Sequence, residues 1–189
     1  MASAEQNLAV ESENKKLKVE QSIIGSSELS EDMQQFLTFI LAGEEYGVDI
    51  LRVQEIKGWD AVTQVPNTPE YVRGVINLRG TIVPIIDLRI RFSMEQLEYG
   101  PTTVVIVLKV NSDDETSRIM GIVVDGVSDV YNVKNEDINA APDFGEGVDS
   151  TFVKGLTTVD EKMVIILDID HMLNSNELEK VNKISGDEE

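Results

Sequence analysis

The sequence predicts an all-β fold made of two copies of one small β unit, with short helices only as connectors. Three observations lead to this prediction. The apolar residues come mostly in runs of four to six, bounded by Gly, Pro, Asn or charged residues. Few stretches keep a helical periodicity for three turns, which favours short strands over helices. In addition, the second half of the chain repeats the pattern of the first half.

The expected strands follow one another at the spacing of small sheets or barrels. They cover residues 36–41, 46–51, 75–78, 82–86, 104–110, 120–124 and 163–167. Pro84 cannot donate to a strand ladder, so its position should face an edge or a bulge. Residues 68–74 are expected to form a short helical connector. Thr68 suits the N-cap, Pro69 the first helical position and Gly74 the left-handed position after the helix.

Two blocks of the chain match each other. Residues 47–56 align with residues 121–130, and residues 71–88 align with residues 152–169 without a gap. The identical pairs in the longer block are Val72/Val153, Gly74/Gly155, Val83/Val164, Ile85/Ile166 and Asp87/Asp168. Chance similarity between aliphatic strands is the alternative, but the paired glycines and aspartates argue against it. Because one such small unit has a marginal core, the two should pack together, and the groove between them is a natural binding surface.

The two ends of the chain are more polar than its middle. Residues 1–34 hold too few aliphatic side chains to bury a face, so we expect a mobile polar tail. The folded part is expected to span residues 35–174, with a boundary between two subdomains near residues 93–102. Residues 175–189 are expected to form a C-terminal helix and an acidic tail.

Composition excludes several classes of function. The chain has 189 residues, with 35 Asp and Glu against 16 Lys and Arg and a formal charge of −19. Such an acidic protein repels phosphate backbones, so we expect no nucleic-acid partner. The absence of cysteine excludes disulfides and thiolate metal sites, and the cytosol is the default location. No apolar run approaches the roughly 20 residues of a membrane helix, so direct membrane insertion is not expected.

Candidate catalytic residues are few. His171 is the only imidazole, and Asp87 and Asp168 occupy equivalent positions at strand ends. Two carboxylates can form an acid–base pair, but equivalent positions favour two helix caps. A small hydrolase that uses Asp87 or Asp168 with His171 remains an alternative. Residues 113–115 lack the pattern of a calcium loop, and no glycine-rich phosphate loop is present, so no metal or cofactor is expected.

Arg79 and Trp59 are the candidate contact residues that stand out. Arg79 and Gly80 suit the tip of a hairpin, where Gly80 can take a positive φ and the guanidinium projects from a rigid turn. An ordinary solvated charge is the alternative, and the counterpart turn at Asp160 and Glu161 shows that the turn does not require arginine. Trp59, the only tryptophan, is either an interface anchor or a cap on the core.

Four segments resemble the CheW family of bacterial chemotaxis coupling proteins. They are residues 45–56, 67–69, 72–89 and 121–130, and the third contains N-L-R-G-x-x-x-P-x-x-D-L-R. The resemblance covers residues 35–174 and implies two SH3-like five-stranded β-barrels. It also implies a non-enzymatic adaptor that links the cytoplasmic tips of methyl-accepting chemoreceptors to the histidine kinase CheA. Such a protein would be cytoplasmic and recruited to membrane receptor arrays.

The resemblance also implies contact residues and one further alternative. The receptor-facing surface would include Glu55, Arg79, Val104 and Val127. The kinase-facing surface would involve Val53, Ile56 and Gly74. An isolated regulatory domain of a chemotaxis kinase would look similar, but no ATP-binding glycine boxes or phosphotransfer histidine domain accompany it here. The chain is expected to be a monomer in isolation.

Overall fold

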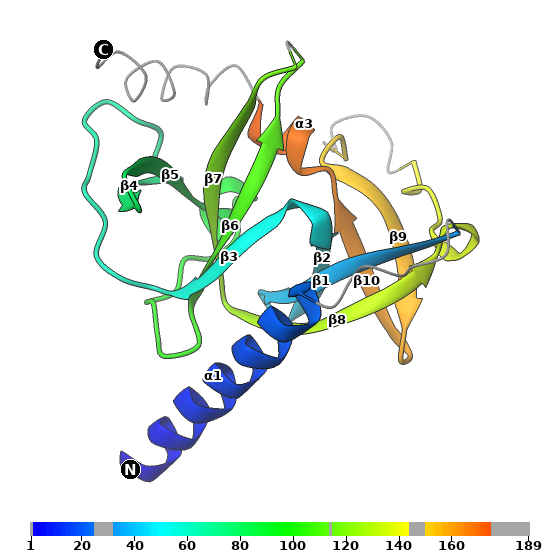
Figure 1. Ribbon diagram of the computed structural model, residues 1–189, viewed down its shortest axis with the longest axis horizontal. Helices are drawn as coiled ribbons and strands as arrows, with labels where there is room; N and C mark the ends of the chain where they lie inside the picture. Colours follow the sequence, from blue (N-terminus) through cyan, green and yellow to red (C-terminus); the bar gives the residue numbers. More distant parts are fainter. Residues whose placement is uncertain (1, 25–31, 114, 144–149, 175–189) are drawn as a thin grey trace.

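Ten β-strands dominate the part of the chain that the computed structural model describes, residues 2–24, 32–113, 115–143 and 150–174 (Figure 1). The strands are β1 Met33–Leu41, β2 Glu44–Asp49, β3 Val53–Gly58, β4 Val72–Leu78, β5 Thr81–Asp87, β6 Val104–Asn111, β7 Ser117–Val124, β8 Gly126–Lys134, β9 Val153–Val159 and β10 Lys162–Leu167. The helical elements are α1 Ala2–Ile24, α2 Leu88–Arg91 and α3 Ile169–Leu173, with 3-10 turns η1 Ile50–Arg52 and η2 Asn135–Asp137. Apart from α1, the helical elements are short connectors, as predicted.

The strands in the described ranges form two five-stranded sheets with the same internal order. Sheet A has the order β8-β1-β2-β10-β9, and sheet B has the order β3-β6-β7-β5-β4. The residue offsets of the sequence repeat map four strands of sheet A, β8, β2, β10 and β9, onto the strands at the same places in sheet B, and the sheet order makes β1 and β6 the fifth pair. The central parallel contacts match as well, since Ile166 pairs with Gly47 and its counterpart Ile85 pairs with Gly121. The predicted duplication is confirmed.

The two halves of the chain exchange strands. The first half places β1 and β2 in sheet A but β3 to β5 in sheet B. The second half places β6 and β7 in sheet B but β8 to β10 in sheet A. Sheet B is therefore made by the continuous segment 53–124. The subdomain boundary expected near residues 93–102 falls within this segment, between α2 and β6. The expectation differs from the structure because a repeat shows which strands are equivalent, not which strands pair.

Each sheet curls into an SH3-like barrel that is closed by the chain following its edge strand. Thr63, beyond β3, bridges to Val75 on β4, and Asn139, beyond β8, bridges to Leu156 on β9. Gly74 lies beside the first bridge with a φ of +142°, and a Cβ there would collide with the carbonyl oxygen of Thr63. Glycine is required at this position because the two backbones approach so closely.

The buried side chains of the described residues form three clusters, and the largest draws on strands of both sheets. Along β6, Val105 and Val107 pack inside the barrel of sheet B, whereas Ile106 and Leu108 pack in the cluster shared by the two barrels. A smaller cluster around Phe36 fills the barrel of sheet A. Because strands such as β6 bury both faces, their sequences are continuous aliphatic runs rather than alternating patterns.

The N-terminal region differs from the mobile tail that was expected for residues 1–34. Residues Ala2–Ile24 form α1, whose C-terminal end lies against the body while its N-terminal part projects away (Figure 1). The segment contains neither Gly nor Pro and is rich in good helix formers. Neither α1 nor any other helix among the described residues has the length and apolar character needed to cross a membrane. The helix expected within residues 175–189 lies outside the described residues.

The predicted helical connector at residues 68–74 is wrong. The amide of Val72 donates to the carbonyl of Pro69 at 2.9 Å, which closes a turn, and β4 begins at Val72. The Thr68 hydroxyl donates to the carbonyl of Val65 instead of capping a helix. Pairing of Val72–Leu78 with β5 therefore outweighs the local helix signals.

Pro84 lies where its missing amide is tolerated. The parallel ladder between β5 and β7 begins at Ile85, just after Pro84. In sheet A the corresponding ladder already begins at Val164, the counterpart of Val83. Both ladders hold three pairs, so the ladder beside Pro84 is displaced along the strand and is not shortened. The prediction that Pro84 faces an edge or a bulge is wrong, because Pro84 belongs to β5, an interior strand of sheet B, and lies opposite Val75 on β4. The missing amide is tolerated because the ladder with β7 starts only after Pro84.

Candidate partner-binding surface

Arg79 projects from the hairpin turn between β4 and β5. Arg79 and Gly80 have φ values of 52° and 89°, and a two-residue type I′ hairpin turn requires a positive φ at both of these positions. The amide of Gly80 donates to Asn77 Oδ1 at 2.8 Å, which ties the turn together. The Arg79 side chain is 81% exposed, so the ordered turn presents a positive charge to solvent.

Glu55 on β3 holds the Arg79 guanidinium in place. Arg79 Nη2 donates to Glu55 Oε2 at 2.9 Å, and the Glu55 side chain is only 26% exposed. Barrel closure brings β3 beside the β4–β5 hairpin, which explains why residues so far apart in sequence meet. An exposed pair of this kind contributes at most about 1 kcal/mol. Its main effect is to fix the position of the guanidinium, and it unites two of the predicted receptor-facing residues.

The other predicted contact residues do not form a surface. Val53, Ile56, Val104 and Val127 are buried members of the cluster shared by the two barrels. Gly74 is buried at the closing bridge. The strands turn these apolar side chains inward, so they offer a partner almost no area of their own. Their roles in receptor and kinase binding stay predictions from the resemblance.

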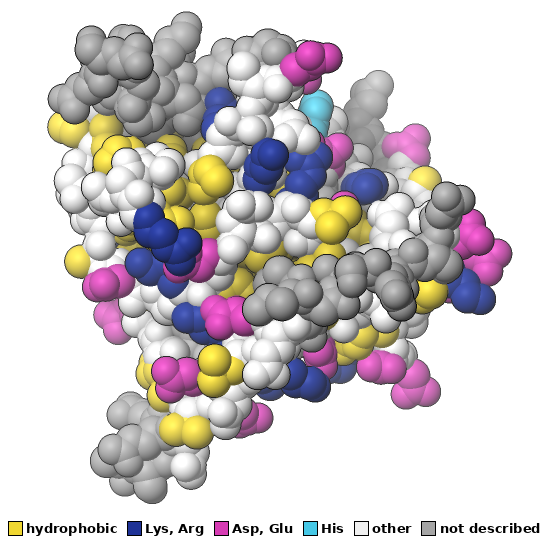
Figure 2. Space-filling model, in the orientation of Figure 1, with side chains coloured by type: hydrophobic (Ala, Val, Ile, Leu, Met, Phe, Trp, Pro, Cys, Tyr) yellow, Lys and Arg dark blue, Asp and Glu magenta, His cyan; other side chains and the backbone are white. Residues whose placement is uncertain are grey.

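The face that carries β3 and α1 is electrically mixed. Figure 2 shows several Lys and Arg side chains near the upper middle of this face, whereas acidic side chains are most frequent along its lower and right-hand margins. The formal charge of −19 is thus not spread evenly. A projecting arginine on an acidic protein gives a partner a local positive point of attachment and helps to set its orientation.

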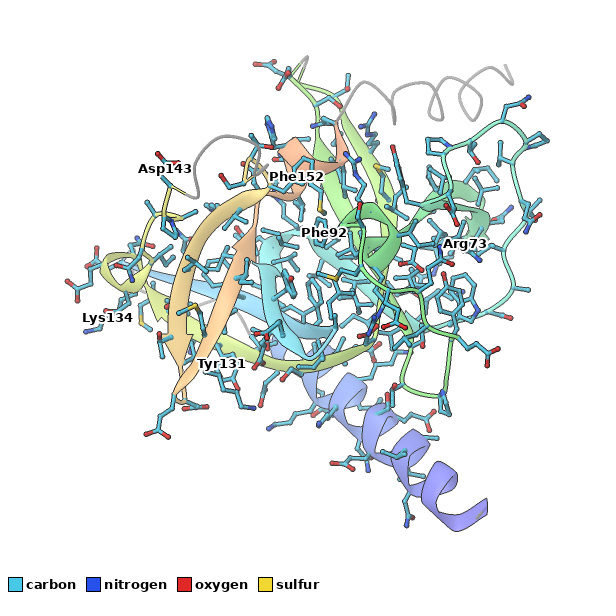
Figure 3. The ribbon with its side chains drawn as sticks, turned by 180° about the vertical axis from the view of Figure 1, so that it is seen from behind. Arg73, Phe92, Tyr131, Lys134, Asp143 and Phe152 are labelled. Atoms are coloured by element: carbon cyan, nitrogen blue, oxygen red, sulfur yellow. The ribbon has the colours of Figure 1, made fainter. Side chains whose placement is uncertain are left out.

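A groove of about 1140 Å³ lies between the end of α2 and the barrel of sheet A. Tyr46, Phe92 and Phe152 line it as a row of rings, with successive centroids 6.1 and 6.4 Å apart. Figure 3 shows Phe92 and Phe152 close together in the view from behind. The guanidinium of Arg91 lies over the rings of Tyr71 and Phe152, at 4.7 and 5.1 Å. The sequence predicted a groove between two units but not its aromatic lining.

Asp87 caps α2 and also receives the hydroxyl of Tyr99. The backbone amides of Arg89 and Ile90 donate to Asp87 Oδ1 at 2.8 and 3.2 Å, and Tyr99 donates to the other oxygen. Burial raises the pKa of the Tyr99 phenol, and the hydrogen bond to Asp87 raises it further. Trp59 packs on Tyr99 with the ring centroids 4.2 Å apart, and it is a cap on the core of the sheet B barrel.

Asp168 repeats the capping role in the other barrel. Its carboxylate accepts from the amide of His171 at 3.0 Å at the start of α3, while the His171 ring lies 6.1 Å from the ring of Phe152. The predicted capping role is therefore confirmed for Asp87 and for Asp168, which lie at the ends of strands in different sheets. Among the described residues, no group of three or more acidic or histidine side chains could hold a metal ion.

Two ion pairs tie the barrels together. Arg89 on α2 binds Asp125 in the link between β7 and β8, and Arg52 in η1 binds Asp170 on α3. The amide of Ala42, in the β1–β2 turn, also donates to Asp125, at 2.8 Å. These contacts fix the relative position of the two barrels, and so the position of β3 relative to β8.

Comparison with known proteins agrees with this architecture. The sequence pattern of the CheW-like domain matches residues 35–177, most of the chain. The chain belongs to the CheW-like domain family. It is 47% identical to a chemotaxis protein CheW of Klebsiella aerogenes over 80% of this chain and 89% of that protein. It is 35% identical to a chemotaxis protein CheW of Rhizobium meliloti, over 77% and 91% of the two chains.

A solved CheW-like structure has the same fold. The crystal structure of the scaffolding protein TtCheW from Thermoanaerobacter tengcongensis superposes with a TM-score of 0.67 and 32% sequence identity, over 76% of this chain and 94% of that chain. The CheW-like domain thus includes both barrels and the pair formed by Glu55 and Arg79. In contrast, α1 lies outside the residues that match the family.

Proposed function

We propose that this CheW-like chain is a non-enzymatic adaptor that connects the cytoplasmic tips of methyl-accepting chemoreceptors to the histidine kinase CheA. Membership of the CheW-like family supports the proposal, because the similar proteins named above are chemotaxis proteins and one is called a scaffolding protein. The adaptor would work in the cytoplasm at membrane receptor arrays. There, many weak contacts between repeated components add up to a stable assembly.

The observation that carries the proposal is the exposed Arg79 guanidinium held by Glu55. A receptor tip is a helical hairpin, and a helix that lies along a barrel needs one fixed charge to set its register. Arg79 supplies such a charge, because its turn and its ion pair both limit its movement. The receptor side of the adaptor is therefore centred on β3 and the β4–β5 hairpin.

The kinase side is proposed to involve β3 and β4 around Val53, Ile56 and Gly74. These residues are buried, so they would act by shaping the surface of the barrel and not by direct side-chain contact. The exposed backbone and neighbouring side chains of the same strands would meet the kinase. The receptor and kinase surfaces then adjoin, which suits a protein that passes a signal between the two partners.

Reconstitution of kinase control tests the proposal. Autophosphorylation of CheA is measured with receptor cytoplasmic fragments, with and without this chain, and receptor control should require the chain. Arg79→Glu should weaken receptor binding at least about tenfold, as expected for a charge reversal at a contact, with an unchanged melting temperature. Glu161→Arg, in the corresponding turn of the other barrel, is the matched control and should bind normally. Normal coupling by Arg79→Glu would contradict the assignment.

A charge swap separates contact from local structure. The double variant Glu55→Arg with Arg79→Glu keeps an ion pair but reverses its direction. If Arg79 contacts the receptor directly, the double variant stays defective. If the pair serves only to hold the hairpin, the double variant recovers.

The hydrolase alternative has its own test. His171→Ala should leave receptor coupling unchanged, because His171 contributes its backbone amide, and not its imidazole, to the cap of α3. A hydrolase would lose turnover of its substrate in the same variant. Turnover by the purified chain that disappears in His171→Ala would support the enzyme instead.

A further inference from the structure

Helix α1 covers the seam between the two barrels, which we define as the facing sides of β3 and β8. α1 packs against both strands. Val19 is 1% exposed, and the ammonium of Lys18 lies 3.7 Å from the carboxylate of Asp129 on β8. Leu17, two residues before Val19, is 53% exposed. The helix therefore has a docked side and a free side near its C-terminal end.

The seam is the same part of the molecule that carries the proposed receptor contact. Val19 joins the buried cluster that contains Val53, Ile56 and Val127, and Glu55 lies on β3 between two of these residues. A helix from this chain thus already occupies a place beside the strand on which the receptor surface is centred. The seam thus binds a helix through one buried aliphatic side chain, Val19, and one cation at its edge, Lys18.

We propose that α1 is an intramolecular occupant of the seam and that it competes with the receptor helix for this surface. The inference rests on the adaptor function proposed above and adds a form of regulation to it. Among the α1 side chains that the structure describes, Val19 is the only one that is buried. The docking is therefore weak, and a partner helix that buries more apolar surface displaces α1.

The size of the effect follows from the fraction of molecules in which the seam is free. If α1 covers the seam in half to nine-tenths of the molecules, the apparent affinity for the receptor falls about two- to tenfold. Release of α1 restores that affinity without any change in the contact surface itself.

Thiol reactivity tests the docking directly, because the natural chain has no cysteine. Val19→Cys and Leu17→Cys are made separately in the full-length chain, and each is modified with a thiol reagent. The cysteine at position 19 should react about two- to tenfold more slowly than the one at position 17, because the same covered fraction protects it. A saturating receptor cytoplasmic fragment should remove this protection. Equal rates in the free protein would overturn the docking, and protection that persists in the complex would overturn the competition.

Affinity provides the second test and separates this inference from the proposed function. Val19→Glu should bind the receptor fragment about two- to tenfold more tightly than the natural chain, whereas Leu17→Glu, the matched control on the free side, should not change affinity. Equal affinity in Val19→Glu and the natural chain would overturn the inference while the adaptor function stands. If neither chain binds the fragment, the receptor-binding function and the competition both fail. The thiol rates of the free protein would still decide whether α1 is docked.

Discussion

Arg89 and Asp125 form a two-pronged ion pair, in which Arg89 Nε donates to Asp125 Oδ1 and Nη2 donates to Oδ2, both at 2.6 Å. The repeat places Asp170 at the position of Arg89, and Asp170 accepts two hydrogen bonds from Arg52. The two copies therefore use the same architectural contact with the charges reversed. Each pair joins a short helix at the end of one sheet to the chain segment that crosses between the sheets.

The two pairs should differ in their contribution to stability. The Arg89 side chain is 12% exposed and that of Arg52 is 25% exposed, whereas their partners Asp125 and Asp170 are similarly exposed, so the Arg89 pair is better shielded from water. We expect Arg89→Ala to lower the free energy of unfolding by about 2 to 3 kcal/mol and Arg52→Ala by about 1 to 2 kcal/mol. Urea unfolding followed by tryptophan fluorescence measures both. A larger loss for Arg52→Ala would contradict this ranking.

The two helix caps should also be unequal. Asp87 accepts two backbone amides and the Tyr99 hydroxyl, whereas Asp168 accepts the one amide of His171. Loss of a cap costs about 1 kcal/mol, and the further hydrogen bond adds about 1 kcal/mol. Asp87→Ala should therefore destabilise the protein about twice as much as Asp168→Ala in the same unfolding assay. Equal losses would show that the Tyr99 bond contributes nothing.

Alkaline pH should weaken the fold through Tyr99. Its pKa is raised in the folded protein by burial and by the hydrogen bond to Asp87, so the unfolded chain loses the phenolic proton first. The stabilising contribution is complete below about pH 10, the ordinary tyrosine value, and is lost as the pH rises above it. The stability difference between the natural chain and Tyr99→Phe should therefore stay constant up to about pH 10 and shrink as the pH rises above it. A difference that stays constant would contradict the raised pKa.

Among the glycines that the structure describes, Gly74 should tolerate alanine least. Gly74→Ala combines a φ of +142° with a collision against the Thr63 carbonyl, so we expect a loss of at least about 3 kcal/mol. Gly58→Ala is the control, because a Cβ at Gly58 meets nothing within 4 Å. It should change stability by less than about 1 kcal/mol. Similar melting temperatures for the two variants would contradict the close approach at the barrel closure.

Much of the fold could be predicted from the pattern of apolar runs and from the repeat. The pairing of Asp87 with Asp168 in the alignment pointed to two equivalent caps, and the structure confirms both. The strand exchange could not be predicted, because each copy carries the same strand signals whichever sheet it joins. α1 was missed because its aliphatic residues follow no single helical face, and a helix held by one buried valine leaves little trace in a sequence.

The candidate surface was predictable only in part. The hairpin signal at Arg79 and Gly80 identified the projecting arginine, since turn chemistry is local. Its partner Glu55 was named through family resemblance, because barrel closure is a property of the whole fold. The same resemblance named four apolar residues without showing that they are buried. Alignment transfers positions between relatives, but exposure depends on the way in which the strands pack.

The strand exchange has a consequence for how the nascent chain folds on the ribosome. β1 and β2 emerge first, yet their neighbours β8 and β10 are among the last strands to be translated. The barrel of sheet B has all of its strands as soon as residue 124 has left the exit tunnel. The barrel of sheet A is thus the first to be started and the last to be completed, after all strands of the sheet B barrel are available.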